Sequence, residues 1–321
     1  MLSGTNTIAE CSNINLSLYS YLGSQLWEAF GVYDSEQFID QFCELKKVDI
    51  ISPSLEVESR MACVGFKNLD ALRTILFTNG EFKTAKQVGL KVPEPKPQQV
   101  IVEMDPVQQG IYNSTADELE SLLSSGQARR NPGAMLAALA RLNAAALHPS
   151  LVKQSSGDGW TYESAAKAAS SGAVDVDSPK LRECARRILA SPGCGHVVFC
   201  DFVAIHAWLK ALLVDRGLDA ARIGVMNAQT TKSAADRSRL AERFNDGELD
   251  VCIVNAVAYE GIDLQRRTCS LHHLDLPWEP ATLQQRNGRG VRQGNEFGEV
   301  DIYVYMAGRS VDGLRFQTIN G

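Results

Sequence analysis

Residues 196–228 have the sequence HVVFCDFVAIHAWLKALLVDRGLDAARIGVMNA, in which an apolar run is followed by a helical pattern and a second apolar run. The first run, HVVFC, is short and rich in apolar and β-branched residues, as is typical of a strand buried on both faces. IHAWLKALLVDRG predicts a helix that ends at Gly217, and RIGVMNA predicts the second strand. Two strands joined by a helix are expected to lie parallel in one sheet.

The same alternation continues towards the end of the chain. Helical patterns cover 178–191 and 233–247, strand patterns cover 250–255, 270–276 and 300–308, and the helical sequence ATLQQRNGRGVR (281–292) separates the last two strands. This order predicts an α/β fold with a mostly parallel sheet and helices on both faces. Such sheets bind ligands at the carboxyl ends of their strands.

The residues before position 178 have a less regular pattern. Residues 1–113 mix helix and strand signals and include a strand at 99–104, followed by a helix that begins at Asp105-Pro106. Residues 114–177 contain two helical stretches and then, from 153, a Ser-, Gly- and Ala-rich segment that predicts a linker. We therefore divide the chain into 1–113, 114–177 and 178–321.

The composition is that of an ordinary globular protein. The chain has 321 residues, 45% of them hydrophobic, and a net charge of -6, which excludes a uniformly basic nucleic-acid-binding coat. No signal peptide and no apolar run of about 20 residues is present, so we expect a soluble cytoplasmic protein without a membrane partner. The eight cysteines are irregularly spaced, which predicts buried thiols rather than disulfides or zinc ligands. We predict no metal site.

The segment QQRNGRGVRQGN (284–295) places three arginines among three glycines. If the helix continues, Gln285, Arg289 and Arg292 are spaced i, i+4, i+7 and share one face. Gly288 and Gly290 remove Cβ atoms there, which permits the close approach of a ligand or another backbone. Two arginines on one stripe suit a polyphosphate, because they stay charged and present planar donors. The alternative is an arginine face exposed to solvent.

The loop NAVAYEGIDLQ (255–265) follows a predicted strand and therefore lies where ligands bind in this architecture. It contains Glu260, Gly261 and Asp263, and the Asp263 carboxylate is placed to accept a hydrogen bond from a ribose hydroxyl. The alternative is a tight turn closed by an Asx hydrogen bond.

Four segments in this order resemble the second RecA-like lobe of superfamily 2 helicases, with the Swi/Snf-type DNA translocases as the most similar group. They are HVVFCDF, ADRSRLAERFNDG, VNAVAYEGIDLQ and LDLPWEPATLQQRNGRGVRQGN. The Gln-x-x-x-Arg-x-x-Arg-x-Gly motif VI of that family maps onto Gln285, Arg289, Arg292 and Gly294. LSGTN (2–6) is similar to motif III of the family, and the last two segments most resemble helicase-like proteins of phages and plasmids.

The resemblance implies a RecA-like C-terminal lobe at 178–321, preceded by a helical segment and an incomplete first lobe at 1–113. It implies that Arg292 is an arginine finger that acts with Arg289, and that Gln285 orients the nucleotide or the attacking water. The nucleotide-binding residues that it implies are Glu260, Gly261, Asp263 and Gly288, and the residues that it implies for coupling in motif III are Ser3, Gly4 and Thr5.

The same resemblance places DNA-backbone contacts at the ends of the strands. The residues concerned are Asp201, Phe202, Gln229, Thr230, Thr231 and Asn255. The alternative is that these are ordinary polar residues at strand ends.

The sequence contains no Gly-x-x-x-x-Gly-Lys-Ser/Thr phosphate loop, which this family carries in its first lobe. We therefore expect ATP and Mg²⁺ to bind only when a first lobe is supplied, by a partner chain or by a longer parent protein, and no hydrolysis by this chain alone. The family implies a bacterial or phage-encoded protein with DNA as its partner. The alternatives are a non-enzymatic DNA- or protein-binding module and a truncated product without function.

Overall fold

The computed structural model describes residues 23–51, 57–81, 83, 87–125, 132–152, 160–259 and 261–320. The chain divides into two compact units, and the boundary between them lies between Gly89 and Leu90.

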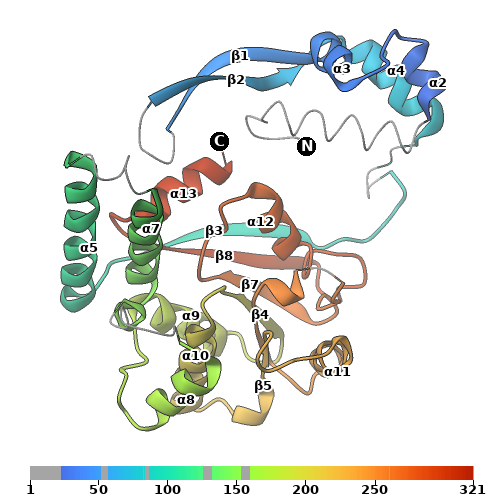
Figure 1. Ribbon diagram of the computed structural model, residues 1–321. Helices are drawn as coiled ribbons and strands as arrows, with labels where there is room; N and C mark the ends of the chain where they lie inside the picture. Colours follow the sequence, from blue (N-terminus) through green and yellow to red (C-terminus); the bar gives the residue numbers. More distant parts are fainter. Residues whose placement is uncertain are drawn as a thin grey trace. The chain divides into compact units, whose positions relative to one another are not determined.

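The second unit contains a six-stranded sheet in which every neighbouring pair of strands is parallel (Figure 1). The strand order is β3-β8-β7-β4-β6-β5. The strands are β3 Glu94–Val102, β4 Gly195–Phe199, β5 Ile223–Met226, β6 Val251–Val254, β7 Thr268–His273 and β8 Glu299–Ala307. The predicted α/β fold is confirmed, and five of these strands lie where the alternating pattern predicts them.

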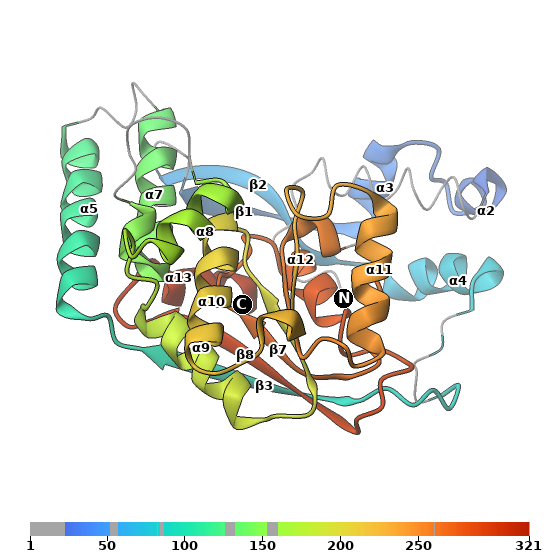
Figure 2. The same cartoon turned by 90° about the horizontal axis from the view of Figure 1, so that it is seen from below.

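Helices cover both faces of this sheet (Figure 2). Val198 faces one side, where it shares a core with Trp208 of α10 (Val203–Asp215) and Leu181 of α9 (Pro179–Ala190). Val197 faces the other side, where it shares a core with Phe244 of α11 (Ala234–Asn245). Neighbouring residues of a strand point to opposite faces, so a continuous apolar strand fills both cores. The helices are α9 Pro179–Ala190, α10 Val203–Asp215, α11 Ala234–Asn245, α12 Pro280–Asn287 and α13 Val311–Asn320.

Two further helices, α5 (Pro106–Ser124) and α7 (Pro132–Leu147), share a small apolar cluster around Tyr112 and Leu142. The predicted start of α5 is confirmed: Asp105 is its N-cap and accepts a 2.8 Å hydrogen bond from Gln108 N. A short 3-10 helix, η1 (Pro149–Leu151), follows α7.

The first unit has its own core, built around Trp27, Phe38, Phe42 and Ile75. β1 (Cys43–Ile51) and β2 (Val57–Phe66) form an antiparallel pair. The helices are α2 Ser24–Glu28, α3 Ser35–Phe42 and α4 Leu69–Asn79.

Two of the predicted segment assignments need correction. β3 lies inside the proposed segment 1–113, but it pairs with β8 along its whole length and so belongs to the second unit. The predicted linker at 153–177 contains a helix, α8 (Tyr162–Ser170), whose Ala165 is fully buried in the same core as Trp208. Its small alanines let α8 pack closely against α10, and a linker has no such core contact.

The cysteine prediction is wrong at one pair. Cys194 and Cys269 form a disulfide between the amino ends of β4 and β7. Five cysteines are buried thiols as predicted: Cys43, Cys63, Cys184, Cys200 and Cys252. Among the described helices, none combines the length and the apolar composition that a bilayer crossing requires.

Candidate functional site

The turn after α12 differs from the predicted continuous helix. α12 ends at Asn287, with Gly288 as its C-cap, so Arg289 and Arg292 do not share a helical face with Gln285. Gly290 is buried, and a Cβ atom on it would lie 2.7 Å from Thr268 Cγ2 and 2.8 Å from a methyl group of Leu271. This glycine therefore lets the turn pack closely against β7. The predicted close approach of a ligand or another backbone at Gly288 and Gly290 stays a prediction.

The turn nevertheless brings the predicted arginines to the loop that follows β6. Arg289 Nη1 donates a 2.7 Å hydrogen bond to the carbonyl of Ile262. Arg292 Nη1 lies 2.6 Å from Asp263 Oδ1, in an ion pair whose side chains are 51% and 62% exposed. Gly261 has a φ of +68°, which favours glycine at this bend. Arg289, Arg292, Gly261 and Asp263 thus form one neighbourhood.

Gln285 is exposed on α12 and Gly288 is half-buried at its end. Glu260 of the same predicted set lies outside the described residues. The motif III residues Ser3, Gly4 and Thr5 also lie outside them.

The most strongly buried charge of this region is Arg286, which the sequence analysis did not select. Its side chain is 0% exposed, and its Nη atoms lie 2.9 Å from Asp275 Oδ1 and 2.9 Å from Asp201 Oδ2. Tyr259 donates a 2.6 Å hydrogen bond to Asp201 Oδ1, and burial raises the pKa of Tyr259, which keeps its hydroxyl protonated. The guanidinium also lies 4.8 Å from the Tyr259 ring centre.

This network changes what Asp201 can do. Its carboxylate is held by Arg286 and Tyr259, and its backbone N donates a 2.7 Å hydrogen bond to Asp275 Oδ2. The Asp201 carboxylate therefore has a structural role at the end of β4, and the predicted contact of Asp201 with DNA stays a prediction. The signal for the network in the sequence was Asp275 in the predicted strand 270–276, together with Arg286, which lies between the selected residues Gln285 and Arg289.

The predicted DNA contacts after β5 are organised by Asn227, which is fully buried. Its Oδ1 accepts hydrogen bonds from the backbone N atoms of Gln229 (2.9 Å) and Thr230 (3.0 Å). Thr231 is only 4% exposed and donates from Oγ1 to the Asn227 carbonyl, so its hydroxyl does not face solvent. Gln229 Oε1 accepts from Tyr162 N. An asparagine at a strand end that closes an Asx turn is the signal that would have identified this residue.

The remaining predicted DNA contacts also lie at strand ends. Asn255 follows β6, is half-buried and accepts a 3.4 Å hydrogen bond from Val257 N. Phe202 is the half-buried N-cap of α10. Because β4, β5 and β6 are parallel neighbours, the residues that follow them lie along one edge of the sheet.

A cavity of about 430 Å³ adjoins the Arg286 network at the same edge of the sheet. Asp201, Phe202, Asp275 and Trp278 contribute to its lining. Trp278 is 61% exposed, and the guanidinium of Arg315 lies 4.2 Å from its ring centre.

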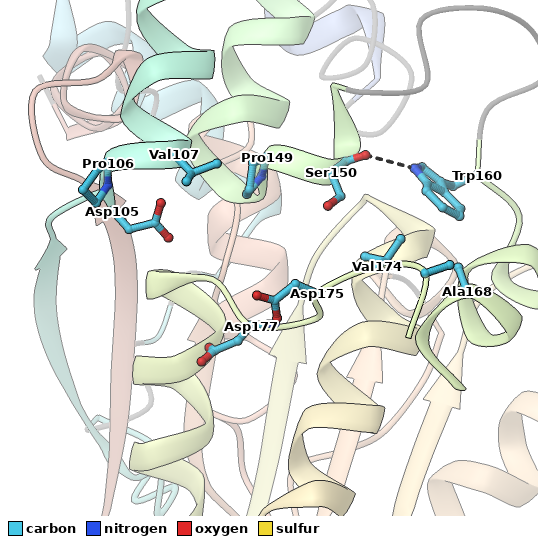
Figure 3. Close-up of a pocket in the computed structure, with 11 residues that line it drawn as sticks. Asp105, Pro106, Val107, Pro149, Ser150, Trp160, Ala168, Val174, Asp175 and Asp177 are labelled. Carbon is cyan, nitrogen blue, oxygen red and sulfur yellow. Dashed lines mark hydrogen bonds between the residues drawn. The ribbon is translucent and has the colours of Figure 1, made fainter. Parts of the chain in front are cut away.

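A larger cavity of about 570 Å³ lies elsewhere, between the start of α5, η1 and residues 173–177 (Figure 3). Asp105, Asp175 and Asp177 line it together with Trp160, and no predicted site residue does. Asp177 pairs with Arg182 and Asp105 caps α5, so these carboxylates have structural partners.

Residues 180–294 match the family model of the helicase conserved C-terminal domain. This segment is a helicase C-terminal domain. It contains Asp201, Asn227, Arg286, Arg289 and Arg292, so the geometry above is that of a helicase C-terminal lobe.

Among curated proteins, the chain is similar to the "Defense against restriction protein B" of Escherichia phage P1. The two are 23% identical over an alignment 419 positions long, gaps included, which covers 93% of this chain and 19% of the phage protein. The chain therefore spans about a fifth of the length of this relative.

Solved structures share the fold. The C-terminal part of the Fun30 ATPase domain has a TM-score of 0.56 at 15% identity. This match covers 71% of the present chain and 90% of the Fun30 chain. The SWI2/SNF2 ATPase core of Sulfolobus solfataricus, in complex with dsDNA, has a TM-score of 0.53 at 17% identity. This match covers 77% of the present chain and 49% of the Sulfolobus chain. The chain thus has the fold of the C-terminal part of Swi2/Snf2 ATPases, as the motif resemblance predicts.

Proposed function

We propose that the helicase C-terminal domain acts as the second lobe of an ATP-dependent DNA translocase of the Swi/Snf type, with Arg292 as its arginine finger. ATP and Mg²⁺ are bound by a first lobe, supplied in trans or by a longer parent protein. The likeness to a protein of Escherichia phage P1 supports a phage or bacterial origin.

The observation that carries this proposal is the exposed ion pair between Arg292 and Asp263 at the loop after β6. Nη1 of the arginine lies 2.6 Å from Oδ1 of the aspartate. An ion pair with both side chains about half exposed contributes only about 0–1 kcal/mol. Arg292 can therefore exchange the Asp263 carboxylate for a phosphate at little cost. Arg286, by contrast, is fully buried between two carboxylates and has no such freedom.

The neighbouring residues fit the same role. Arg289 is held by the Ile262 carbonyl at 2.7 Å, which fixes the turn from which Arg292 extends. Gly261 and Asp263 form the adjacent surface for the nucleotide, and Gln285 is exposed two residues before the end of α12.

For DNA, the geometry favours Gln229, Thr230 and Asn255 among the predicted contacts. They follow β5 and β6 at one edge of the sheet, whereas the hydroxyl of Thr231 is buried and the Asp201 carboxylate is held by Arg286. Contacts of this kind position the protein on the phosphate backbone without reading the sequence.

The test is DNA-stimulated ATP hydrolysis by this chain alone and in a mixture with a separately expressed first lobe from the sequence upstream. We expect hydrolysis only in the mixture and a loss of about 10³-fold or more in Arg292→Ala, since arginine fingers contribute 10³–10⁵ in rate. Arg309→Ala is the matched control, because Arg309 also forms an exposed ion pair, with Glu103. Both residues are distant in sequence from the loop after β6. Unchanged hydrolysis in Arg292→Ala would exclude the finger.

A second candidate is a DNA-binding module without turnover, favoured by the exposed ring of Trp278 beside Arg315 at the 430 Å³ cavity. Base stacking on an aromatic ring contributes about 1–3 kcal/mol per base. This candidate predicts DNA binding by the isolated chain that weakens in Trp278→Ala, with no ATP hydrolysis in either preparation.

A further inference from the structure

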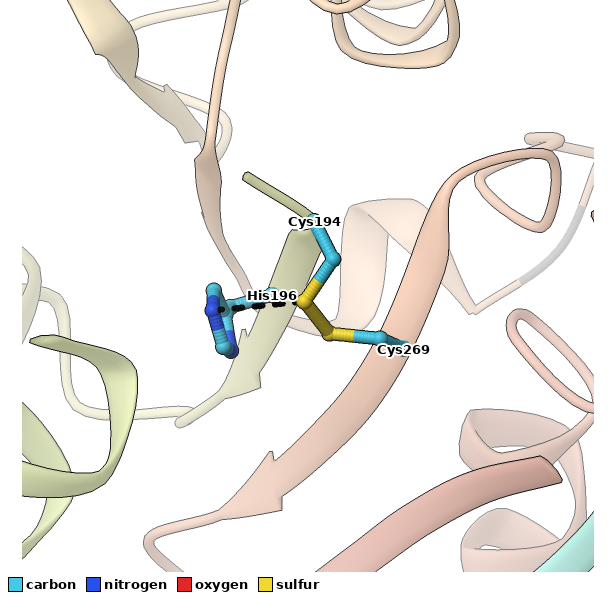
Figure 4. Close-up of side chains that lie close together, drawn as sticks. All are labelled: Cys194, His196 and Cys269. Carbon is cyan, nitrogen blue, oxygen red and sulfur yellow. Dashed lines mark hydrogen bonds between the residues drawn. A yellow bond between two sulfur atoms is a disulfide. The ribbon is translucent and has the colours of Figure 1, made fainter. Parts of the chain in front are cut away.

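Three side chains with metal-binding chemistry meet at the amino ends of β4 and β7, at the opposite edge of the sheet from Asp201 and Asn255. Cys194, His196 and Cys269 have ligand atoms within 4.8 Å of one another (Figure 4). The two sulfurs form a disulfide with Cα atoms 5.8 Å apart, and His196 Nε2 lies 3.8 Å from Cys194 Sγ.

A break in the strand register creates this meeting point. Gly195 pairs with Thr268 and His196 pairs with Ser270, so Cys269 is an extra residue in β7 without a partner in β4. Such a bulge redirects a side chain and recurs beside functional sites. Here it turns Cys269 towards Cys194.

Exposure separates this pair from the other described cysteines. Cys194 and Cys269 are half-buried and accessible to a reductant or an ion, while His196 is buried beneath them. The remaining described thiols are all buried.

We propose that this cluster is a zinc site that forms when the disulfide is reduced. A dithiol reductant breaks the S–S bond, supplies two electrons and two protons to the cysteine sulfurs, and is itself oxidised to a disulfide. Zn²⁺ then displaces the two thiol protons and binds both thiolates and Nε2 of His196. Two thiolates balance the charge of the ion, and a water completes the four-coordinate shell that zinc prefers.

The spacing fits such a site. Zn–S bonds of about 2.3 Å and a Zn–N bond of about 2.0 Å place tetrahedral ligand atoms roughly 3.5–3.8 Å apart. The observed 3.8 Å between His196 Nε2 and Cys194 Sγ is close to the roughly 3.5 Å expected for a nitrogen and a sulfur on one zinc ion. The two cysteine sulfurs can move apart to the distance expected for two zinc ligands once the disulfide bond between them is broken.

A hydrogen-bond chain holds the imidazole from behind. His196 Nδ1 lies 2.6 Å from Ser270 Oγ, Ser270 Oγ lies 2.8 Å from His272 Nε2, and His272 Nδ1 lies 2.9 Å from Tyr305 Oη. With zinc on Nε2, the Nδ1–H donates to Ser270, whose hydroxyl donates to His272. Zinc-bound histidines are typically oriented by such a partner on their second nitrogen.

The same series of hydrogen bonds is also compatible with the disulfide form. There His196 Nε2 donates to the carbonyl of Ser191 at 3.0 Å, and Nδ1 accepts from Ser270. Because a hydroxyl both donates and accepts, Ser270 satisfies either tautomer of His196.

The test is a Co²⁺ titration of the full chain, stripped of metal and reduced with a dithiol. We expect about one Co²⁺ per chain, with the visible bands of tetrahedral cobalt and thiolate-to-metal charge transfer, displaced by Zn²⁺. Cys194→Ser and Cys269→Ser are expected to abolish these bands, and Ser270→Ala to weaken binding about 10–100-fold. Cys252→Ala is the matched control and is expected to bind normally, since this thiol is buried in β6. The oxidised chain is expected to bind no Co²⁺ at this site.

Two results would overturn the proposal: no tetrahedral cobalt bands in the reduced wild-type chain, or bands that persist in Cys194→Ser. If a serine variant does not fold, native alkylation of the reduced wild-type chain decides. Zinc is expected to protect Cys194 and Cys269 from iodoacetamide, and equal labelling with and without zinc contradicts the site.

Discussion

Arg286 and Asp275 form a buried ion pair in which Nη1 of the arginine lies 2.9 Å from both Oδ1 and the backbone carbonyl of the aspartate. The pair ties α12 to the segment that follows β7. A second carboxylate, that of Asp201, lies on the other Nη atom and joins the end of β4 to the same group. One guanidinium therefore connects three elements at the edge where the candidate site lies.

Loss of this arginine should be far more costly than loss of Arg292. Arg286→Ala leaves Asp275, whose side chain is 10% exposed, without its cation, and breaking a buried pair costs about 3–5 kcal/mol. Arg292→Ala removes an exposed pair and should change the free energy of unfolding by less than about 1 kcal/mol. Urea unfolding of both variants checks this, and similar losses in the two would contradict the assignment of Arg286 as the structural arginine.

Gly290→Ala should destabilise the turn after α12. Its Cβ would meet Leu271 and Thr268 at 2.7–2.8 Å, and overpacking of this kind typically costs about 1–3 kcal/mol. Gly298→Ala is the control, since a Cβ there meets nothing within 4 Å, and should be neutral. Thermal unfolding compares the two variants, and an unchanged Tm in Gly290→Ala would show that the turn can move away from β7.

Acid should destabilise the second unit through His273. Burial, followed by the charge of Arg286, lowers the pKa of His273 from 6.5 to about 3. The unfolded chain takes up a proton on this side chain below about pH 6.5 while the folded chain does not, so the free energy of unfolding falls as pH decreases from about 6.5 towards 3.

The measurement is urea unfolding between about pH 7 and pH 4 for the wild type and His273→Gln. The variant should lose stability less steeply, by about 1 kcal/mol per pH unit. The carboxylates titrate in both proteins and cancel in the comparison. Parallel pH profiles would show that His273 is not the group responsible.

Lys180 and Asp312 should behave as a coupled pair. Their side chains are 3% and 5% exposed and lie 2.5 Å apart, joining α9 to α13. Lys180→Met leaves a buried carboxylate and should cost about 3–5 kcal/mol, whereas Lys180→Met with Asp312→Leu should recover part of that loss. Recovery is incomplete because Asp312 also accepts from Ala307 N. A double-mutant cycle by denaturation measures the coupling, and additive losses would argue against it.

The fold was predictable where local pattern decides structure. The strands β4, β5 and β6 are short and mostly apolar runs. A run such as VCIV (251–254) can bury its side chains and pair its backbone only inside a sheet that is covered on both faces. The cap residues Asp105 and Ser233 also marked the starts of their helices, because capping depends on neighbours three residues away. The helix containing Gln285 was predicted too long, because the glycines after Asn287 end it. The close packing of Gly290 against β7 is a tertiary contact, which the local sequence does not show.

The candidate site was predictable in part for the same reason. The loop 255–265 was selected because it follows a predicted strand, and Arg289 and Arg292 were selected from their spacing. The structure brings the loop and the arginines together through Ile262 and Asp263. The role of Asn227 was missed, although an Asx turn is a local feature. Arg286 was missed because its partner Asp201 is 85 residues away in the chain.

By itself, then, the sequence determined the alternation of strands and helices, the parallel sheet and the set of residues at its carboxyl edge, because these depend on hydrophobic period and on neighbours within a few residues. Only the tertiary structure decided which arginine is buried and which is exposed, and that Cys194 meets Cys269 from 75 residues away. The physical reason is that burial and pairing depend on strand order and register, and a single register shift between β4 and β7 is enough to turn one cysteine towards another.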